Sequence, residues 1–339
     1  NATGRNAQLR GVMFGEREPE FGVAPELEFR SNLNPSQQEA VRLALSCRDL
    51  AIIHGPPGTG KTTTVAELIY QAVMREQKVL ASGPSNTAVD NLLLRLADQQ
   101  LNVVRIGHPA RVAKRLQENT LDALVEKHEN MAIAKEMYRE AEAIFRKLER
   151  YTRAKPGRGA KLAMRAEAKQ LKNDARMMER QAVEHILDRA DVICLTTTGD
   201  DDILRDRFFD MVVIDEACQS TEPGCWIPLL RADRIVLAGD HQQLPPTVLS
   251  DEAAKAGFDR SLMQRLIEHY GEEVTRQLDV QYRMHENLMQ FSSAKFYSDS
   301  LIAHESVSEH LLADLPSFSS SELSDEPAQF IDTAGAGWE

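Results

Sequence analysis

A glycine-rich segment of eight residues carries the clearest chemical pattern in the sequence. Residues 55–62 read GPPGTGKT, which matches the GxxxxGK[ST] pattern of phosphate-binding loops. Glycines let the backbone wrap closely around phosphate groups, and the N–H groups of the loop and of a following helix present partial positive charge to an anion. A Gly-Pro turn before a core helix is the plain alternative. The phosphate-binding interpretation is favoured over a simple turn, because an apolar run precedes the segment and a helical pattern follows it.

This loop predicts a site for ATP and Mg²⁺. We expect Lys61 to bridge the β- and γ-phosphates and the hydroxyl of Thr62 to reach the metal. The predicted phosphate-binding residues are Gly55, Pro56, Pro57, Gly58, Thr59, Gly60, Lys61, Thr62 and Thr63.

Two adjacent carboxylates supply the second part of such a site. Residues 211–216 read MVVIDE, so Asp215 and Glu216 come at the tip of an apolar run. At that tip Asp215 can hold Mg²⁺ through water, and Glu216 is free to polarise the attacking water as a general base. One carboxylate alone could be a helix cap. Together with the upstream loop, the pair favours ATPase chemistry.

Six short apolar runs alternate with helical patterns and must position these residues. The predicted strands are residues 50–54, 78–82, 103–106, 191–196, 211–215 and 234–238. Each ends in, or runs into, Gly, Ser, Thr, Asp or His, and the carboxyl edge of a parallel sheet is where α/β folds bind ligands. The sequence therefore predicts the α/β class, with a parallel sheet covered by helices. A Ser-, Glu- and Pro-rich segment at 305–329 predicts a long loop.

A helical hairpin is expected between the third and fourth strands. Apolar residues step by three and four along two segments, and residues 155–159, KPGRG, supply the turn between them. The stepping residues are Met131, Ala134, Tyr138, Ala141, Phe145 and Leu148, then Met164, Ala168, Leu171, Ala175, Met178 and Ala182. From 111 to 190 there are 19 Lys and Arg against 13 Asp and Glu. A solvated surface hairpin and a basic binding surface both fit this charge.

The composition of the whole chain indicates an acidic globular protein. Its 339 residues are 42% hydrophobic and 27% charged, with a formal net charge of -12, which taken alone argues against a nucleic-acid partner. No run reaches the roughly 18 apolar residues of a membrane span. The four cysteines form no CxxC pair, which predicts a reducing compartment without zinc or disulfides. The chain does not begin with Met, and we interpret it as a fragment, an excised piece or a processed form.

Further motifs narrow the class of ATPase. They are LNPSQ at 33–37, GPSNTAVDNL at 83–92, GDHQQLPP at 239–246 and QYRMH at 281–285. The set resembles superfamily 1 helicases, more narrowly the Upf-like group, and within it the immunoglobulin mu-binding (Smubp-type) helicases. The resemblance covers nearly the whole chain and implies a RecA-like P-loop fold.

The resemblance also implies roles for individual residues. Gln37 would read the adenine edge and Tyr282 would stack on the ring. Gln243 would sense the γ-phosphate and couple it to movement, and Asp240 would support the metal-side network. Arg283 would bring positive charge to the γ-phosphate, which suits the charge that develops in phosphoryl transfer. Taken alone, Gln243 and Tyr282 would more often be a surface amide and a core aromatic residue.

Two loops are expected to contact nucleic acid. The family places single strands against the loops that here contain Pro84, Ser85, Asn86 and Asn91, and Thr196, Thr197 and Thr198. Small hydroxyl and amide side chains with exposed N–H groups suit phosphate and sugar contacts, although ordinary turn chemistry also uses them. The family inserts a helical subdomain over the nucleic-acid channel where the basic hairpin lies. The choice between RNA and DNA stays open, since it depends on the 2′-hydroxyl.

The resemblance suggests a division into domains and a truncated second motor domain. We expect an N-terminal linker at 1–30 behind a missing β-barrel, a RecA-like domain at 31–275 with a helical insertion at 116–188, and an incomplete second RecA-like domain at 276–339. The glutamine-glycine-glutamate and threonine-arginine-alanine-arginine motifs of that second domain are missing from the sequence. The expected parent is a 5′-to-3′ helicase, monomeric and cytoplasmic or also nuclear, while this chain alone binds ATP and does not unwind.

Two other classes remain as alternatives. GPPGTGKT is also common in ring-forming AAA-type ATPases that act without nucleic acid. Those would need an asparagine sensor strand, where this sequence has GDHQQLPP. The other alternative is an adaptor built on the coiled-coil hairpin, with ATP as its switch.

Overall fold

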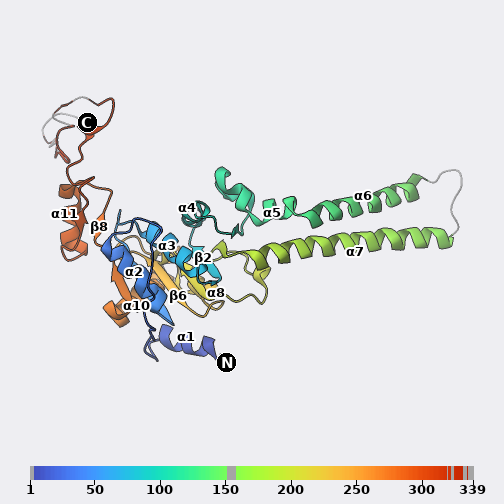
Figure 1. The fold of residues 1–339 in the computed structure, drawn as a ribbon, viewed down its shortest axis with the longest axis horizontal. Helices are drawn as coiled ribbons and strands as arrows, with labels where there is room; N and C mark the ends of the chain where they lie inside the picture. The colour runs from blue at the N-terminus through green and yellow to red at the C-terminus, as the bar shows by residue number, and fades with distance from the viewer. Residues whose placement is uncertain (1–3, 151–157, 319, 322–323, 331–333, 335–339) are drawn as a thin grey trace.

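A seven-stranded parallel sheet forms the centre of the computed structural model, which describes residues 4–150, 158–318, 320–321, 324–330 and 334 (Figure 1). The strand order is β3-β4-β2-β5-β6-β1-β7. The strands are β1 (Leu50–His54), β2 (Val79–Gly83), β3 (Val103–Arg105), β4 (Val192–Thr196), β5 (Met211–Ile214), β6 (Ile235–Gly239) and β7 (Thr275–Gln277). All six predicted strands are confirmed to within one residue at each end. The seventh, the edge strand β7, was not predicted.

Helices cover both faces of this sheet, as the α/β class requires. In β1, Leu50 and Ile52 face one core while Ala51 and Ile53 face the other, because side chains alternate along a strand. The first core contains α1 (Arg5–Met13), α8 (Glu222–Leu229) and α10 (Leu262–Tyr270). The second contains α2 (Pro35–Ser46), α3 (Lys61–Val73) and α4 (Asn86–Ala97). The four cysteines are free and buried, in agreement with the prediction that they form no disulfide.

Local signals explain where these helices begin. Asn34 caps α2 through a reciprocal pair of hydrogen bonds with Gln37, and Pro35 occupies the first turn. Ser85 caps α4 by accepting a hydrogen bond from the amide of Ala88. By contrast, α3 follows Gly60 and has no side-chain cap, so the first N–H groups of this helix have no side-chain acceptor from the cap residue.

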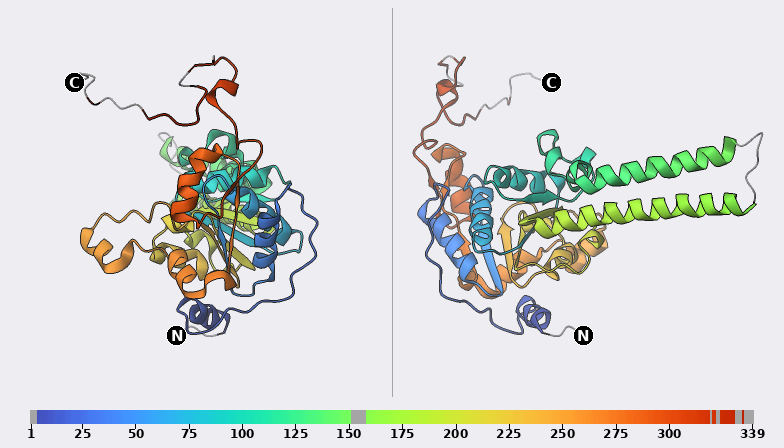
Figure 2. Two further views of the ribbon diagram at one scale, coloured as in Figure 1. Left: turned by 90° about the vertical axis from the view of Figure 1, so that its left-hand side faces the viewer. Right: turned by 45° about the vertical axis from the view of Figure 1, so that its right-hand side comes forward.

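The predicted hairpin is confirmed as α6 (Glu129–Arg150) and α7 (Arg158–Arg189), which project together from one side of the sheet (Figures 1 and 2). Its seam consists of fully buried alanines at intervals of seven, which let the two helices approach closely. They are Ala134, Ala141, Ala168, Ala175 and Ala182. Tyr138 donates a hydrogen bond of 3.0 Å from its hydroxyl to Glu179 across the seam. Residues 155–157 of the predicted turn lie outside the described residues, and Arg158 and Gly159 open α7.

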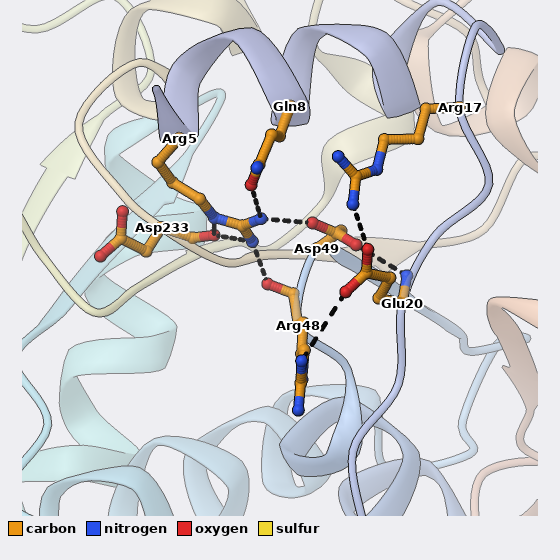
Figure 3. A network of polar contacts seen from close by, with 7 residues as sticks. All are labelled: Arg5, Gln8, Arg17, Glu20, Arg48, Asp49 and Asp233. Carbon is orange, nitrogen blue, oxygen red and sulfur yellow. Dashed lines mark hydrogen bonds and ion pairs between the residues drawn. The ribbon is translucent and has the colours of Figure 1, made fainter. Parts of the chain in front are cut away.

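The N-terminal helix α1 is held against the body by polar contacts. The guanidinium of Arg5 donates to Asp49 Oδ1 at 2.6 Å and to the carbonyl of Asp233 (Figure 3). Asp49 is buried, and its Oδ2 accepts from the amide of Glu20 at 2.7 Å. Tyr270 donates from its hydroxyl to the carbonyl of Val12 at 2.6 Å. Part of the segment expected to be a linker is thus a helix docked on the first core.

A smaller unit follows the sheet. β8 (Val280–Gln281) pairs with β9 (Ile302–Ala303) beside α11 (Glu286–Phe296), and Met289, Tyr297 and Leu301 form a small core there. Beyond β9 the described residues contain only the short helix η7 (Leu312–Asp314), which agrees with the predicted loop.

Short helical segments complete the described chain. They are α5 (Leu121–Lys127), α9 (Asp251–Ala253), η1 (Pro109–Arg111), η2 (Lys114–Asn119), η3 (Asp202–Leu204), η4 (Ala217–Gln219), η5 (Ala254–Phe258) and η6 (Gly271–Glu273). Among the described residues, none of the helices combines the length and apolar character needed to cross a membrane.

Candidate active site

A cavity of about 520 Å³ lies at the carboxyl edge of the sheet, where the predicted phosphate-binding residues converge. The phosphate-binding loop supplies one wall. Glu216 and Gln243 follow β5 and β6, and Tyr282 and Arg283 follow β8. The lining residues are Gly55 to Thr63, Arg95, Glu216, Gln243, Tyr282 and Arg283. Four of the five predicted catalytic residues therefore line one cavity, with Asp215 buried directly behind it.

The loop can hold this shape only with glycine at two positions. Gly58 and Gly60 have φ values of 80° and 76°, in the left-handed region that other residues rarely adopt. A Cβ atom at Gly58 would lie 2.6 Å from Cβ of Arg283. One at Gly60 would lie 2.6 Å from Nε2 of Gln37. The glycines of the motif thus provide both the turn and the close approach of neighbouring segments.

The charged groups of the site are tightly paired. Lys61 Nζ lies 2.5 Å from Glu216 Oε1 and 3.4 Å from Asp215 Oδ1. Burial alone would lower the pKa of Lys61, but the charges and hydrogen bonds of Asp215 and Glu216 outweigh it and raise that pKa, so the ammonium group stays protonated. The protonated ammonium group of Lys61 therefore lies at the position expected for the β- and γ-phosphates, with its charge compensated by Asp215 and Glu216.

Oxygen ligands for a divalent cation stand beside this lysine. The hydroxyl of Thr62 donates to Asp215 Oδ2 at 3.3 Å, so the two predicted metal-holding groups are neighbours. A hydroxyl and a carboxylate are hard oxygen donors of the kind that Mg²⁺ uses, together with water and nucleotide phosphates. The donor set therefore fits Mg²⁺.

Glu216 has a strained backbone. Its φ and ψ are 55° and 37°, a left-handed conformation that is uncommon for glutamate. This conformation turns the chain sharply after β5, between the buried Asp215 and the cavity-lining Glu216. Strain of this kind, on the order of 1–3 kcal/mol, is concentrated at functional sites.

The two residues expected to hold the adenine base differ in their placement. Tyr282 lines the cavity and is 39% exposed, and its ring lies 4.5 Å from that of His304. Gln37 is buried and is not among the lining residues. Its amide donates to the carbonyl of Thr59 at 2.9 Å and accepts from the amide of Asn34 at 3.0 Å. Gln37 therefore braces the phosphate-binding loop in this structure.

Asp240 lies behind the cavity and is 2% exposed. It accepts hydrogen bonds from His54, Gln243 and Tyr297. Burial would raise the pKa of Asp240, but these hydrogen bonds outweigh it and lower the pKa to about 2. A buried anion therefore stands next to the expected γ-phosphate sensor, Gln243.

The loops predicted to contact nucleic acid lie side by side. β2 pairs with β4 so that Gly83 is opposite Thr196, and the amide of Thr197 donates to the carbonyl of Gly83 at 2.9 Å. These neighbouring loops hold six of the seven predicted residues, namely Pro84, Ser85, Asn86, Thr196, Thr197 and Thr198. Ser85 serves as a helix cap, and Thr197 is buried, so their side chains have structural roles.

The seventh predicted residue, Asn91, lies on α4 away from these loops. It lines a second cavity of about 670 Å³ that also includes Thr62, Arg95 and Arg115. The side chain of Asn86 is held by an arginine, since its Oδ1 accepts a hydrogen bond from the guanidinium of Arg105 at 2.8 Å.

Sequence reasoning missed Arg95. This exposed residue of α4 lines both the nucleotide cavity and the second cavity. Within the described part of the chain its side chain has no hydrogen bond or ion pair. The one available signal is its spacing of four residues from Asn91, which puts the two on the same face of α4.

Comparisons with known proteins agree with this geometry. A family model described as an AAA domain matches residues 32–251, and a second model with the same description matches residues 258–337. Both the geometry of the site and these two matches therefore assign the chain to the P-loop class of proteins. It belongs to the superfamily 1 helicases of the Upf-like group.

Individual relatives illustrate this membership. The chain is 43% identical to rat DNA-binding protein SMUBP-2, over 99% of this chain and 34% of that protein. It is 38% identical to the DNA polymerase alpha-associated DNA helicase A of Schizosaccharomyces pombe, over 91% of this chain and 45% of that protein. It is 40% identical to the Drosophila melanogaster regulator of nonsense transcripts 1 homolog, over 86% of this chain and 23% of that protein. The chain thus spans less than half the length of each of these relatives.

Proposed function

We propose that the chain is the ATP-hydrolysing part of a motor that moves 5′-to-3′ on single-stranded RNA or DNA. The observation that carries the proposal is the cavity in which Lys61, Glu216, Gln243 and Arg283 converge, with Asp215 behind it. The relatives named as helicases support the same activity.

Several residues in and behind the cavity have distinct roles in ATP binding and hydrolysis. Lys61 binds the β- and γ-phosphates, and Thr62 and Asp215 would hold Mg²⁺, which would neutralise phosphate charge. Once Lys61 has turned from Glu216 to the phosphates, Glu216 orients a water molecule for attack on the γ-phosphate and accepts its proton. Arg283 stabilises the charge that spreads over the transferred phosphoryl group. Tyr282 stacks on the adenine, and Gln37 reaches its edge if it leaves the carbonyl of Thr59.

The nucleic-acid strand crosses the adjacent loops after β2 and β4. Exposed backbone and small polar side chains there contact phosphates and sugars without reading the base sequence. The excess of Lys and Arg on α7 adds sequence-independent attraction. We further propose that the motor acts as a monomer in the cytoplasm and also in the nucleus.

The experiment is a comparison of ATP hydrolysis, strand binding and unwinding by the purified 339-residue chain. We expect ATP·Mg²⁺ binding, slow hydrolysis, weak single-strand binding and no unwinding. Robust unwinding by this chain alone would overturn the proposal that it is an incomplete motor. Formation of a stable hexamer with ATP, together with hydrolysis indifferent to single strands, would favour a ring-forming ATPase instead.

A further inference from the structure

One carboxylate behind the nucleotide cavity accepts four hydrogen bonds. Asp240 follows the last residue of β6 and is almost completely buried. Its Oδ1 accepts from His54 Nε2 at 3.0 Å and from the backbone amide of Gln242 at 3.1 Å. Its Oδ2 accepts from Gln243 Nε2 and from the hydroxyl of Tyr297, both at 2.7 Å. Gln243 and Tyr297 thus share a single oxygen atom.

The side-chain donors come from three separate parts of the chain. His54 ends β1, directly before the phosphate-binding loop. Gln243 lines the nucleotide cavity. Tyr297 directly follows α11 and is buried in the small core with Met289 and Leu301, within the region that the second family model matches. Asp240 therefore connects the nucleotide cavity to α11 through one hydroxyl group.

Movement of Gln243 toward the γ-phosphate would remove one of the two side-chain hydrogen-bond donors to Oδ2 of Asp240. If Nε2 of Gln243 turns to the γ-phosphate, Oδ2 of Asp240 keeps Tyr297 as its one side-chain donor among those the structure describes. A buried carboxylate oxygen without a donor is strongly disfavoured. The hydroxyl of Tyr297 therefore allows Gln243 to leave without isolating the anion.

We propose that Tyr297 is a positioning residue that couples the γ-phosphate contact of Gln243 to α11. This inference rests on the proposed function, in which Gln243 senses the γ-phosphate. With Gln243 on the phosphate, the bond from Tyr297 to Asp240 strengthens and fixes the end of α11. With Gln243 back on Asp240, that bond is shared and α11 is held less tightly.

A metal site is the competing interpretation of the same cluster. His54, Asp240 and His241 each offer one ligand atom, and these atoms lie within 4.8 Å of one another. Both oxygens of Asp240, however, already accept two hydrogen bonds each. A cation would have to displace them, so the donor arrangement favours coupling through hydrogen bonds.

The test compares two affinities in the full chain, one for ADP and one for ADP with beryllium fluoride, which mimics the γ-phosphate. In Tyr297→Phe, departure of Gln243 would leave Oδ2 without a side-chain donor. We therefore expect the preference for the beryllium fluoride complex over ADP to fall about tenfold, with ADP affinity unchanged. Hydrogen exchange of residues 286–296 should slow when beryllium fluoride joins ADP in the wild type and should not respond in the variant.

Tyr270→Phe is the matched control, because it also deletes a hydroxyl that lies in the interior. That hydroxyl donates to the carbonyls of Val12 and Arg17, outside the nucleotide cavity. The control should lose thermal stability while keeping the wild-type preference. An unchanged preference in a folded Tyr297→Phe, or an equal fall in Tyr270→Phe, would overturn the inference. Failure of the wild type to bind ADP at all would overturn the proposed function itself.

Discussion

At the residue scale, the phosphate-binding loop depends on glycine for two separable reasons. Gly58 and Gly257 both have φ near +80° to +90°, but a Cβ at Gly58 meets Arg283, whereas a Cβ at Gly257 meets nothing within 4 Å. Gly257→Ala should therefore show the cost of backbone strain alone, about 1–2 kcal/mol of unfolding free energy. Gly58→Ala should cost at least as much and should also abolish ATP binding.

Chemical denaturation and nucleotide titration of the two variants measure these quantities. Equal ATP affinity in Gly58→Ala and Gly257→Ala would mean that close approach to Arg283 has no part in forming the site.

Arg95 offers a second prediction at this scale. Its guanidinium lines the nucleotide cavity and is free of protein partners within the described residues. It can therefore donate to phosphate oxygens without first breaking another bond. Arg95→Ala should weaken ATP binding about fivefold, the size expected for an exposed charged contact. Arg111→Ala, which removes an exposed arginine of η1 outside this cavity, should leave ATP affinity unchanged; an equal loss in both would show a general charge effect.

At the element scale, the alanine seam should decide whether the hairpin forms. Ala175 is fully buried between α6 and α7, so Ala175→Leu overpacks the seam, at a cost of about 1–3 kcal/mol. Hydrogen exchange should accelerate along residues 129–150, while ATP binding at the sheet edge stays unchanged. Ala166→Leu places the same side chain on an exposed position of α7 and should have little effect. Loss of ATP binding in Ala175→Leu would show that the hairpin and the sheet fold as one unit.

The sequence predicted those elements whose patterns are local. The six predicted strands read as apolar runs because both of their faces are buried. The hairpin reads as steps of three and four because its buried seam residues recur every seven positions. β7 is the polar triplet TRQ at the edge of the sheet, half-buried throughout, so no periodicity distinguishes it from a loop. The docking of α1 depends on Arg5 meeting Asp49 and Asp233, which are far away in sequence.

In the candidate site, the residues within sequence motifs were predictable, and those brought in by tertiary packing were not. Lys61, Thr62, Asp215 and Glu216 follow from motifs whose spacing relates directly to strand ends. Arg95 carries no motif and reaches the cavity through the packing of α4 beside α3. The hydrogen bond from Tyr297 to Asp240 joins residues 57 positions apart and could not be read from either segment alone.

At the scale of the whole molecule, the net charge of -12 combines an acidic body and a basic hairpin. Arg165, Lys169 and Arg176 are exposed on α7. Replacing all three with Gln should weaken single-strand binding and reduce the slope of log affinity against log salt by about 2, because each phosphate contact released accounts for roughly 0.7 on a single strand. Titrations at several salt concentrations measure this slope. An unchanged slope would mean that the hairpin is simply a solvated surface.

The central claim is that this chain hydrolyses ATP with separate groups for binding and for chemistry. The most direct measurement is ATP affinity and turnover for Lys61→Ala and Glu216→Gln beside the wild type, by equilibrium titration and phosphate release. Lys61→Ala should lose nucleotide binding, because it removes the buried charge that faces the phosphates. Glu216→Gln should bind ATP as the wild type does and lose turnover, because the amide cannot accept the proton from water. Equal loss of binding in both variants, or full turnover in Glu216→Gln, would contradict the account.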